Sequence, residues 1–323
     1  MECLNWEEEK NYPREGDFLY QLNEDQDGII LMGSNSQNAV LEIPAVIAGL
    51  PVTAIGEGAF QNNTWLREVH LPDTITVLQE FAFDGCEQLD RINLPDGLQR
   101  IEMCALGGTR LTSVSVPVGT VFLGNYAFAG SDFLEEVLLS DHLQDMETNP
   151  FTDCPHLSRI HLSPDHPVFR LQDGLLFDQQ RQITICLIPG FRTLACTVPE
   201  GVETIGAFTF LKHPSLRMVN LPESVRIIED FSFSYCEQLR SIRLPAGLQV
   251  IEMAAMIDCR HLKQLCLPPN LQEIGDIAFA GCTFLTLHVR RGSASWKICR
   301  ERGLPYRCSP RRTHPRCNER PRI

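Results

Sequence analysis

The chain of 323 residues lacks several features that would assign it quickly to a class. Aromatic residues make up only 8% of it, and no run of apolar residues approaches the roughly 18 that a membrane helix needs. Its beginning, MECLNWEEEKNYP, has no basic region followed by an apolar stretch, so no secretory signal is visible and we expect a cytoplasmic protein. The thirteen cysteines show no paired CxxC spacing, which favours reduced thiols over a disulfide framework.

Positive charge is scarce outside the last fifteen residues. The formal net charge is -13, and the ending SPRRTHPRCNERPRI holds five Arg and one Glu, or +4, which leaves -17 on residues 1–308. An acidic body repels phosphate backbones, which argues against nucleic-acid binding by the main domain. We interpret residues 309–323 as a basic disordered tail, with contact to nucleic acid or to an acidic partner as the alternative.

What the chain does have is repetition. FDGCEQLDRINLPDGLQRIEM (Phe83 to Met103) and FSYCEQLRSIRLPAGLQVIEM (Phe233 to Met253) are identical at 14 of 21 positions. A Phe or its replacement recurs every 22 or 23 residues around them, at Phe60, Phe83, Leu106, Phe128, Phe151, Phe210, Phe233, Met256 and Phe279. Five residues earlier stand Ile55, Leu78, Ile101, Leu123, Met146, Ile205, Ile228, Ile251 and Ile274. A third column, usually Pro, keeps the same phase except for one gap of 36 residues, between Ser163 and Pro199. Three columns in phase identify a repeat protein.

Each unit reads roughly LxxIxLPxxLxxIxxxAFxxCxx. In LxxIxLP, apolar and polar residues alternate, which predicts a short strand with one buried face that the Pro ends. The following xxLxxI is expected to turn the chain, and AFxxC is too short for more than a helical turn. One unit cannot bury its own apolar edge, whereas stacked units cover one another. The sequence therefore predicts a β-rich solenoid.

The stretches LPDGLQRIE, LPESVRIIEDFSFSYC and LPPNLQEIGDIAFAGC resemble the BspA-type leucine-rich repeats, a bacterial class of 23-residue repeats. The resemblance implies a right-handed leucine-rich-repeat coil with a parallel concave sheet, short helical turns and capped ends. It also implies a non-enzymatic binding scaffold, often displayed on the cell surface and associated with adhesion. We expect a flexible N-terminus (1–15), an N-terminal cap hairpin with the first rung (16–63), the solenoid (64–290) with a hairpin insertion at 173–190, and a C-terminal cap (291–308).

The outward strand positions vary from rung to rung, whereas the inward positions repeat. One outward column reads Glu68, Arg91, Ser113, Glu136, Arg159, Met218, Ser241, Gln264 and Thr286. The other reads His70, Asn93, Ser115, Leu138, His161, Asn220, Arg243, Cys266 and His288. Polar contacts around a few apolar anchors suit recognition of a protein or an extended peptide. We expect such a partner to bind this concave face of a monomer that contacts no membrane; a solvated face without a partner is the alternative.

Five cysteines stand three residues after the Phe column: Cys86, Cys154, Cys236, Cys259 and Cys282. Other rungs place small hydrogen-bonding residues there, which predicts a reduced thiol that satisfies the backbone of a turn. A ladder of disulfides between stacked neighbours is the alternative. Cys299, Cys308, His314 and Cys317 match the spacing of no known zinc module, so we expect neither a metal nor another cofactor.

One short stretch holds the residue types of a hydrolase triad. HLSPDHP contains His161, Ser163, Asp165 and His166, but triads are assembled in space and need an oxyanion site and a pocket. We interpret it as a polar turn after a strand and expect no enzyme. The remaining enzymatic alternative requires a pocket at the hairpin insertion.

Overall fold

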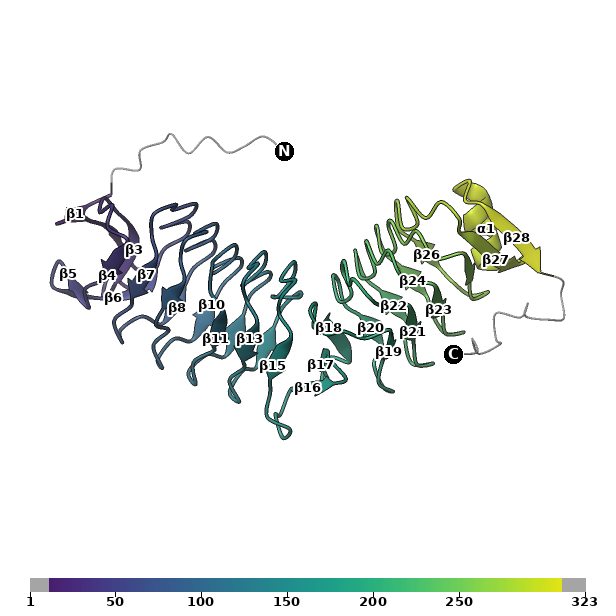
Figure 1. The fold of residues 1–323 in the computed structure, drawn as a ribbon, viewed down its shortest axis with the longest axis horizontal. Coiled ribbons are helices and arrows are strands. Elements are labelled where there is room, and N and C mark those ends of the chain that lie inside the picture. The colour runs from purple at the N-terminus through teal and green to yellow at the C-terminus, as the bar shows by residue number, and fades with distance from the viewer. Residues whose placement is uncertain (1–11, 310–323) are drawn as a thin grey trace.

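The computed structural model describes residues 12–309 as a rod of stacked rungs, built from two columns of short strands (Figure 1). The first column comprises β4 (Val40–Glu42), β7 (Glu68–His70), β9 (Arg91–Ile92), β11 (Ser113–Ser115), β13 (Glu136–Leu138), β15 (Arg159–His161), β19 (Ala195–Thr197), β21 (Met218–Asn220), β23 (Ser241–Arg243), β25 (Gln264–Cys266) and β27 (Thr286–Arg290). The second comprises β6 (Leu50–Ile55), β8 (Val77–Leu78), β10 (Arg100–Ile101), β12 (Phe122–Leu123), β14 (Asp145–Met146), β18 (Ile183–Leu187), β20 (Thr204–Ile205), β22 (Ile227–Ile228), β24 (Val250–Ile251) and β26 (Glu273–Ile274).

The first column consists of the strands predicted from LxxIxLP. Neighbouring strands are parallel and in register, for example Val114 opposite Val137 and Val137 opposite Ile160. The middle residue of nearly every strand is buried and its two neighbours point outward, as the alternation predicted. The column is nevertheless interrupted, because it forms four separate sheets: β4-β7-β9, β11-β13-β15, β19-β21-β23 and β25-β27-β28.

The second column was not predicted. The xxLxxI segment, expected only to turn the chain, contributes a two-residue strand that pairs in parallel with its neighbours, such as Ile101 between Leu78 and Leu123. These strands are continuous over β6-β8-β10-β12-β14 and over β18-β20-β22-β24-β26. Two residues are too few to show an alternating pattern, so periodicity could not separate them from a turn.

The AFxxC segments form a third line of rung-to-rung hydrogen bonds. The amide nitrogen of Phe83 donates to the carbonyl of Ala105 over 2.9 Å, and that of Phe233 to Ala255 over 2.8 Å. Phe60 stacks on Phe83 at 5.2 Å between ring centroids, and Phe210 on Phe233 at 4.8 Å. The predicted Phe column is thus a buried spine, and only its last member, Phe279, is partly exposed.

Additional elements cover both ends of the rod. At the N-terminal end β1 (Arg14–Glu15), β2 (Phe18–Leu22) and β3 (Ile29–Ser34) are antiparallel neighbours, and β5 (Val46–Ile47) pairs with β6. At the C-terminal end helix α1 (Ala294–Glu301) precedes β28 (Tyr306–Ser309), which lies parallel to β27. These elements hide apolar surface and strand edges that an open solenoid exposes.

β1 lies within the N-terminus expected to be flexible (1–15), and β28 includes Ser309 of the expected disordered tail (309–323), so these two limits are wrong. The rest of both segments, residues 1–11 and 310–323, lies outside the described residues. The other domain limits remain a proposal.

The chain leaves the regular rungs at an insertion, where the rod bends (Figure 1). β17 (Leu175–Asp178) and β18 form an antiparallel hairpin inside the expected 173–190 segment, and β16 (Phe169–Gln172) adds a third strand that the sequence did not predict. β18 then pairs in parallel with β20, Ile183 opposite Thr204. The buried apolar residues accordingly form two clusters, one on each side of the hairpin.

Candidate functional site

The two outward columns of the first strand column form one surface, which we call the strand face. All eighteen of its predicted residues are exposed or half-exposed. Register places Ser115, Leu138 and His161 side by side on β11, β13 and β15. The interruptions of the column divide the strand face into four short groups instead of the continuous sheet that was expected.

Charged residues of the strand face pair with one another. The Arg91 guanidinium lies 3.3 Å from the Glu68 carboxylate, and His70 Nε2 lies 3.1 Å from the same side chain. Arg159 is 3.3 Å from Glu136, which His161 also contacts. Exposed pairs of this kind contribute about 0–1 kcal/mol each to stability. They place a basic or imidazole group directly beside both acidic residues of the strand face, Glu68 and Glu136.

Some strand-face residues have a structural task. The Asn93 side chain bridges to the previous rung, with its amide oxygen accepting from the backbone nitrogen of Leu71 at 2.7 Å and its amide nitrogen donating to the Leu71 carbonyl at 2.8 Å. The hydrogen bond from His161, assisted by its charge and that of Arg159, lowers the pKa of Glu136. Asn93 and Glu136 are therefore held by hydrogen bonds within the chain and are less free than their neighbours to form new ones.

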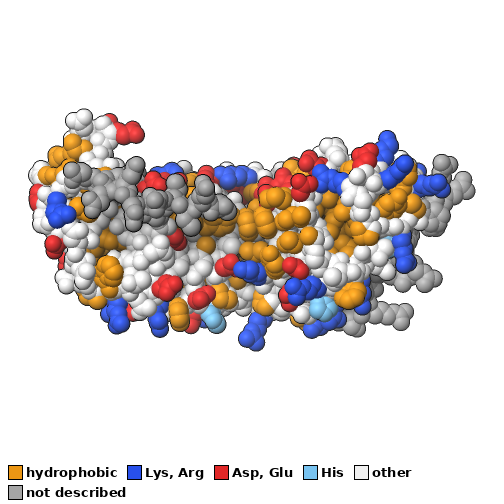
Figure 2. All heavy atoms as spheres, turned by 90° about the horizontal axis from the view of Figure 1, so that it is seen from above, with side chains coloured by type: hydrophobic (Ala, Val, Ile, Leu, Met, Phe, Trp, Pro, Cys, Tyr) orange, Lys and Arg blue, Asp and Glu red, His pale blue; other side chains and the backbone are white. Residues whose placement is uncertain are grey.

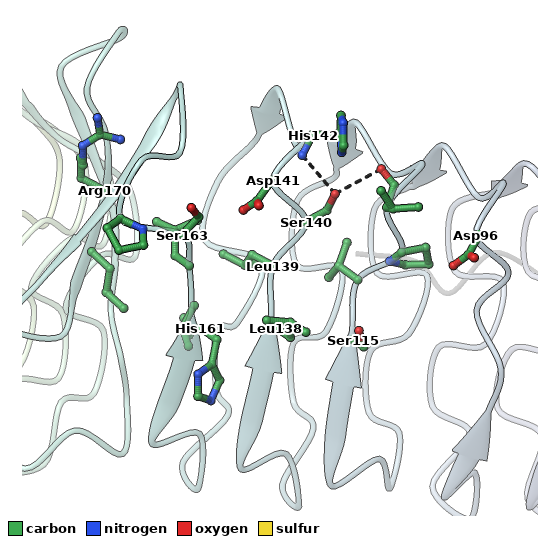
Figure 3. Close-up of a pocket in the computed structure, with 17 residues that line it drawn as sticks. Asp96, Ser115, Leu138, Leu139, Ser140, Asp141, His142, His161, Ser163 and Arg170 are labelled. Atoms are coloured by element: carbon green, nitrogen blue, oxygen red, sulfur yellow. Dashed lines mark hydrogen bonds between the residues drawn. The ribbon is translucent and has the colours of Figure 1, made fainter.

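A hollow of about 950 Å³ opens where β11, β13 and β15 end (Figure 3). The strand face supplies Ser115, Leu138 and His161 to its lining. In Figure 3, Arg170 from β16 stands at one end of the hollow and Asp96 at the other. The hollow therefore runs across the ends of three neighbouring strands.

Two apolar side chains lie open to solvent in this hollow. Val118 is 54% exposed and Leu138 is 50% exposed. Asp141 and His142, from the turn after β13, also line the hollow. The Ser140 hydroxyl accepts from the His142 backbone nitrogen and donates to the Val118 carbonyl at 3.3 Å, which joins this turn to the one before it. Exposed apolar anchors within a polar rim suit the side chain of a bound polypeptide.

Of the suspected triad residues, His161 and Ser163 both line the hollow, but among the described residues no hydrogen bond joins their side chains. His166 is buried, its Nδ1 accepts from the backbone nitrogens of Val168 and Phe169 at 3.2 and 3.0 Å, and its Nε2 lies 3.2 Å from the Ser140 carbonyl. Burial lowers the pKa of His166. His161 instead contacts Glu136. The stretch is a polar turn held by its histidine.

A smaller concavity of about 300 Å³ borders the insertion. Arg181 at its edge pairs with Asp145, and the Thr184 hydroxyl lies 2.8 Å from that of Thr209 and accepts from the Gly206 backbone. These polar groups are therefore already paired or hydrogen-bonded within the chain. The enzymatic alternative thus has a concavity at the insertion, in which the Thr184 hydroxyl is engaged with Thr209 and Gly206.

The cysteine column is structural. Cys86, Cys154, Cys236, Cys259 and Cys282 are free thiols, so the disulfide ladder is wrong. Each thiol donates to the backbone carbonyl of the Phe-column residue one rung earlier, over 2.8–3.1 Å. Burial raises the pKa of Cys86, Cys154 and Cys236 to about 12.

Native thiol labelling is expected to separate these cysteines from Cys308. The thiolate is the reactive form, and a thiol with a pKa near 12 that is also out of contact with solvent reacts with a maleimide at pH 8 at least about a thousandfold more slowly than an accessible one. Cys308 is exposed and free, so it provides the internal control. Peptide mass spectrometry after timed labelling measures both rates. Labelling of Cys236 at the rate of Cys308 would contradict this account.

Neither a metal site nor a membrane helix is found in the described part of the chain. No group of three or more His, Cys, Asp or Glu side chains within residues 12–309 could hold a metal ion. Of the suspected metal ligands, Cys299 is buried, Cys308 is exposed, and His314 and Cys317 lie outside the described residues. None of the helices in this range has both the length and the apolar character to cross a bilayer.

Sequence reasoning did not identify the turn residues that complete the hollow. Val118 follows the Pro of the third column, and Asp96 and Asp141 occupy the same place in neighbouring rungs. Reading that column as a further variable one would have indicated them. Arg170 could not be found in this way, because it comes from the insertion.

A family model described as a BspA type leucine rich repeat region matches the chain in six copies, over residues 53–173 and 193–296. The matched residues make up more than half of the chain. A search of curated proteins returned no match.

Solved structures of bacterial leucine-rich-repeat proteins share the fold. The pneumococcal vaccine antigen PcpA is similar at 20% identity and a TM-score of 0.69, over 86% of this chain and 81% of that one. A leucine-rich repeat protein from Eubacterium ventriosum is similar at 18% identity and a TM-score of 0.69, over 85% and 76%. A leucine rich cell surface protein from Faecalibacterium prausnitzii has 22% identity and a TM-score of 0.52, over 88% and 96%.

Proposed function

Because the chain belongs to the BspA-type leucine-rich-repeat family, we propose that it is a non-enzymatic scaffold that binds a protein or an extended peptide through its strand face. The observation that carries the proposal is the difference between the inward and the outward positions of each strand. Inward residues such as Val137 and Ile160 are buried and alike, whereas the outward Glu136, Leu138 and His161 differ from rung to rung. A constant interior therefore presents a variable surface.

The hollow beside β11, β13 and β15 supports this proposal. It brings the half-exposed Leu138 and Val118 together with polar groups from three rungs. An extended partner that lies along the rod would meet such a hollow together with the polar side chains of the neighbouring strands. We propose further that the scaffold acts as a monomer, since the added strands and α1 cover the ends where another copy could stack.

Charge reversal on the strand face is expected to remove bound partners. The double variant Arg91→Glu/Arg243→Glu places carboxylates where exposed guanidinium groups stand, so a partner selected by these rungs should be retained at least about tenfold less in a pull-down from the source cells. The control Arg192→Glu/Arg291→Glu changes charge equally at exposed arginines outside the two columns. Equal retention by wild type and both variants would show that the strand face is not the binding site.

Adhesion at a cell surface is the alternative proposal. It is favoured by the similarity to a vaccine antigen and to a cell surface protein. The two proposals differ in compartment, since a scaffold for cytoplasmic partners stays inside the cell whereas adhesion requires export. Fractionation of the source cells, combined with surface biotinylation of intact cells, separates them. Protein found only in the cytosol would end the adhesion proposal.

A further inference from the structure

A second surface of the rod carries a row of partly buried aromatic rings. Tyr126, Phe208 and Phe231 each stand two residues before the Phe column, and we call them the aromatic row. The Tyr126 and Phe208 rings meet edge to face at 5.4 Å, and Phe208 and Phe231 are stacked at 5.2 Å. All three residues are only half-buried. Seen from above, hydrophobic side chains gather over the middle of the rod (Figure 2).

The backbone at these positions does not favour aromatic residues. Tyr126 and Phe208 have φ of 58° and Phe231 has φ of 54°, in the left-handed region that bulky residues rarely adopt. The first rung places Gly58 at the equivalent position, with φ of 62° and without such strain. The same left-handed backbone recurs at the equivalent position of other rungs, at Phe81, Cys104, Ala254 and Ile277, so it is a property of the repeat and does not by itself distinguish the aromatic row.

Carboxylates without a cation lie beside the aromatic row. Glu229 and Asp230 directly precede Phe231, and the Asp230 carbonyl accepts from the Phe208 backbone nitrogen at 3.2 Å. We call Glu229, Asp230 and Glu252 the acidic flank. None of the ion pairs formed among residues 12–309 involves any of them. The flank thus takes part in no ion pair of the described residues, although Arg181 lines the same concavity as Glu229.

The pKa values of the acidic flank also indicate that its carboxylates repel one another. Burial raises the pKa of Glu229 and of Glu252, and the Asp230 charge raises both further. Burial, together with the charge of Asp230 among others, also raises the pKa of Tyr126, so the carboxylate acts on the aromatic row itself. Mutual repulsion of this kind is relieved when a cation binds.

An arginine side chain complements both the aromatic row and the acidic flank. A guanidinium group stacks flat on an aromatic ring and forms two parallel hydrogen bonds to a carboxylate. On the strand face the two acidic residues, Glu68 and Glu136, are already paired with Arg91 and Arg159. The acidic flank takes part in no such pair among the described residues, so its carboxylates are available to a cation from a partner.

We propose that the aromatic row and the acidic flank together bind a basic segment of a partner polypeptide, with an arginine packed against Phe231, the last ring of the row, and paired with the flank carboxylates. This site is separate from the strand face and does not depend on the function proposed for it. An extended segment fits because the three rings follow one another along the rod.

Titration of a fluorescein-labelled synthetic peptide of alternating Arg and Leu with the full chain tests the proposal by fluorescence anisotropy. Phe231→Asn is expected to weaken binding about tenfold, since asparagine tolerates the left-handed backbone but offers no ring. Glu229→Gln/Glu252→Gln is also expected to weaken it about tenfold, while the amide oxygen introduced at position 229 keeps an acceptor for the Ala207 backbone nitrogen. Circular dichroism verifies that each variant is folded, and if Phe231→Asn is not, the charge variant decides.

Matched controls separate this site from the strand face. Arg91→Glu/Arg243→Glu should bind the Arg-Leu peptide as the wild type does, and a Glu-Leu peptide should not bind. Wild-type affinity in both site variants, or equal binding of the acidic peptide, overturns the proposal. Binding seen only after deletion of residues 310–323 would identify the chain's own basic tail as the occupant, which overturns a partner segment as well.

Discussion

Replacing Phe233 by Ala is expected to lower the free energy of unfolding by about 3–5 kcal/mol. The side chain is fully buried and stacks on Phe210 at 4.8 Å. Its carbonyl also accepts the Cys259 thiol of the next rung at 3.1 Å. Because each rung is covered only by its neighbours, the cavity weakens contacts on both sides at once. Urea unfolding followed by circular dichroism measures the loss as an earlier midpoint.

Phe284→Ala is the matched control for this experiment. The same side chain is deleted, but Phe284 is 70% exposed, so the change should stay within about 0.5 kcal/mol. Phe83→Ala in the other apolar cluster should repeat the loss seen for Phe233, since its ring is equally buried and stacks on Phe60. Similar midpoints for the Phe233 and Phe284 variants would show that the spine does not hold the rungs together.

Gly275→Ala is expected to destabilise the chain by about 3 kcal/mol, although only one methyl group is added. A Cβ at this position would lie 2.3 Å from the Glu252 carbonyl carbon and 2.3 Å from the Met253 nitrogen. The obstacle is backbone, which cannot rotate away as a side chain can. The Gly275 nitrogen also donates to the Ile251 carbonyl at 2.6 Å, so moving apart would cost a hydrogen bond between rungs.

Gly97→Ala provides the comparison for Gly275. The nearest atom to its added Cβ is the Asp73 carbonyl oxygen at 3.5 Å, an ordinary contact, and Gly97 does not have a positive φ. We expect unchanged stability, or a gain of up to about 1 kcal/mol from the less flexible unfolded chain. Thermal unfolding of both variants decides. A similar loss for the two would mean that close rung contact is not what requires glycine at position 275.

The strand face and the aromatic row differ in how their charges are used. On the strand face Arg91 pairs with Glu68, and Arg159 with Glu136. Beside the aromatic row, Glu229 and Asp230 take part in none of the ion pairs of residues 12–309. A mixed, mostly neutralised surface selects partners by shape and apolar anchors, whereas unpaired charge selects them by sign and increases the rate of encounter.

Periodicity in the sequence was sufficient to predict the buried spine and the first strand column. Phe128 and Leu123 recur in phase because every rung must offer the same inward side chains to its neighbours, so local pattern and tertiary position coincide. The same reasoning placed Leu138 and His161 on the outward side. It did not show the hollow that they line, since this hollow also needs Arg170 from a strand outside the repeat.

The sequence by itself determined a stacked repeat, its constant interior and the variability of its outward strand positions. Only the tertiary structure decided the second strand column, the bend at the insertion and the meeting of Tyr126 with Phe208, which lies beyond the insertion in the chain. The physical reason is that burial of an apolar column repeats with every rung and is therefore visible as a period. Which partly buried rings touch depends instead on the residue that each rung places at the left-handed position and on how the hairpin leaves and rejoins the stack, and neither of these repeats along the chain.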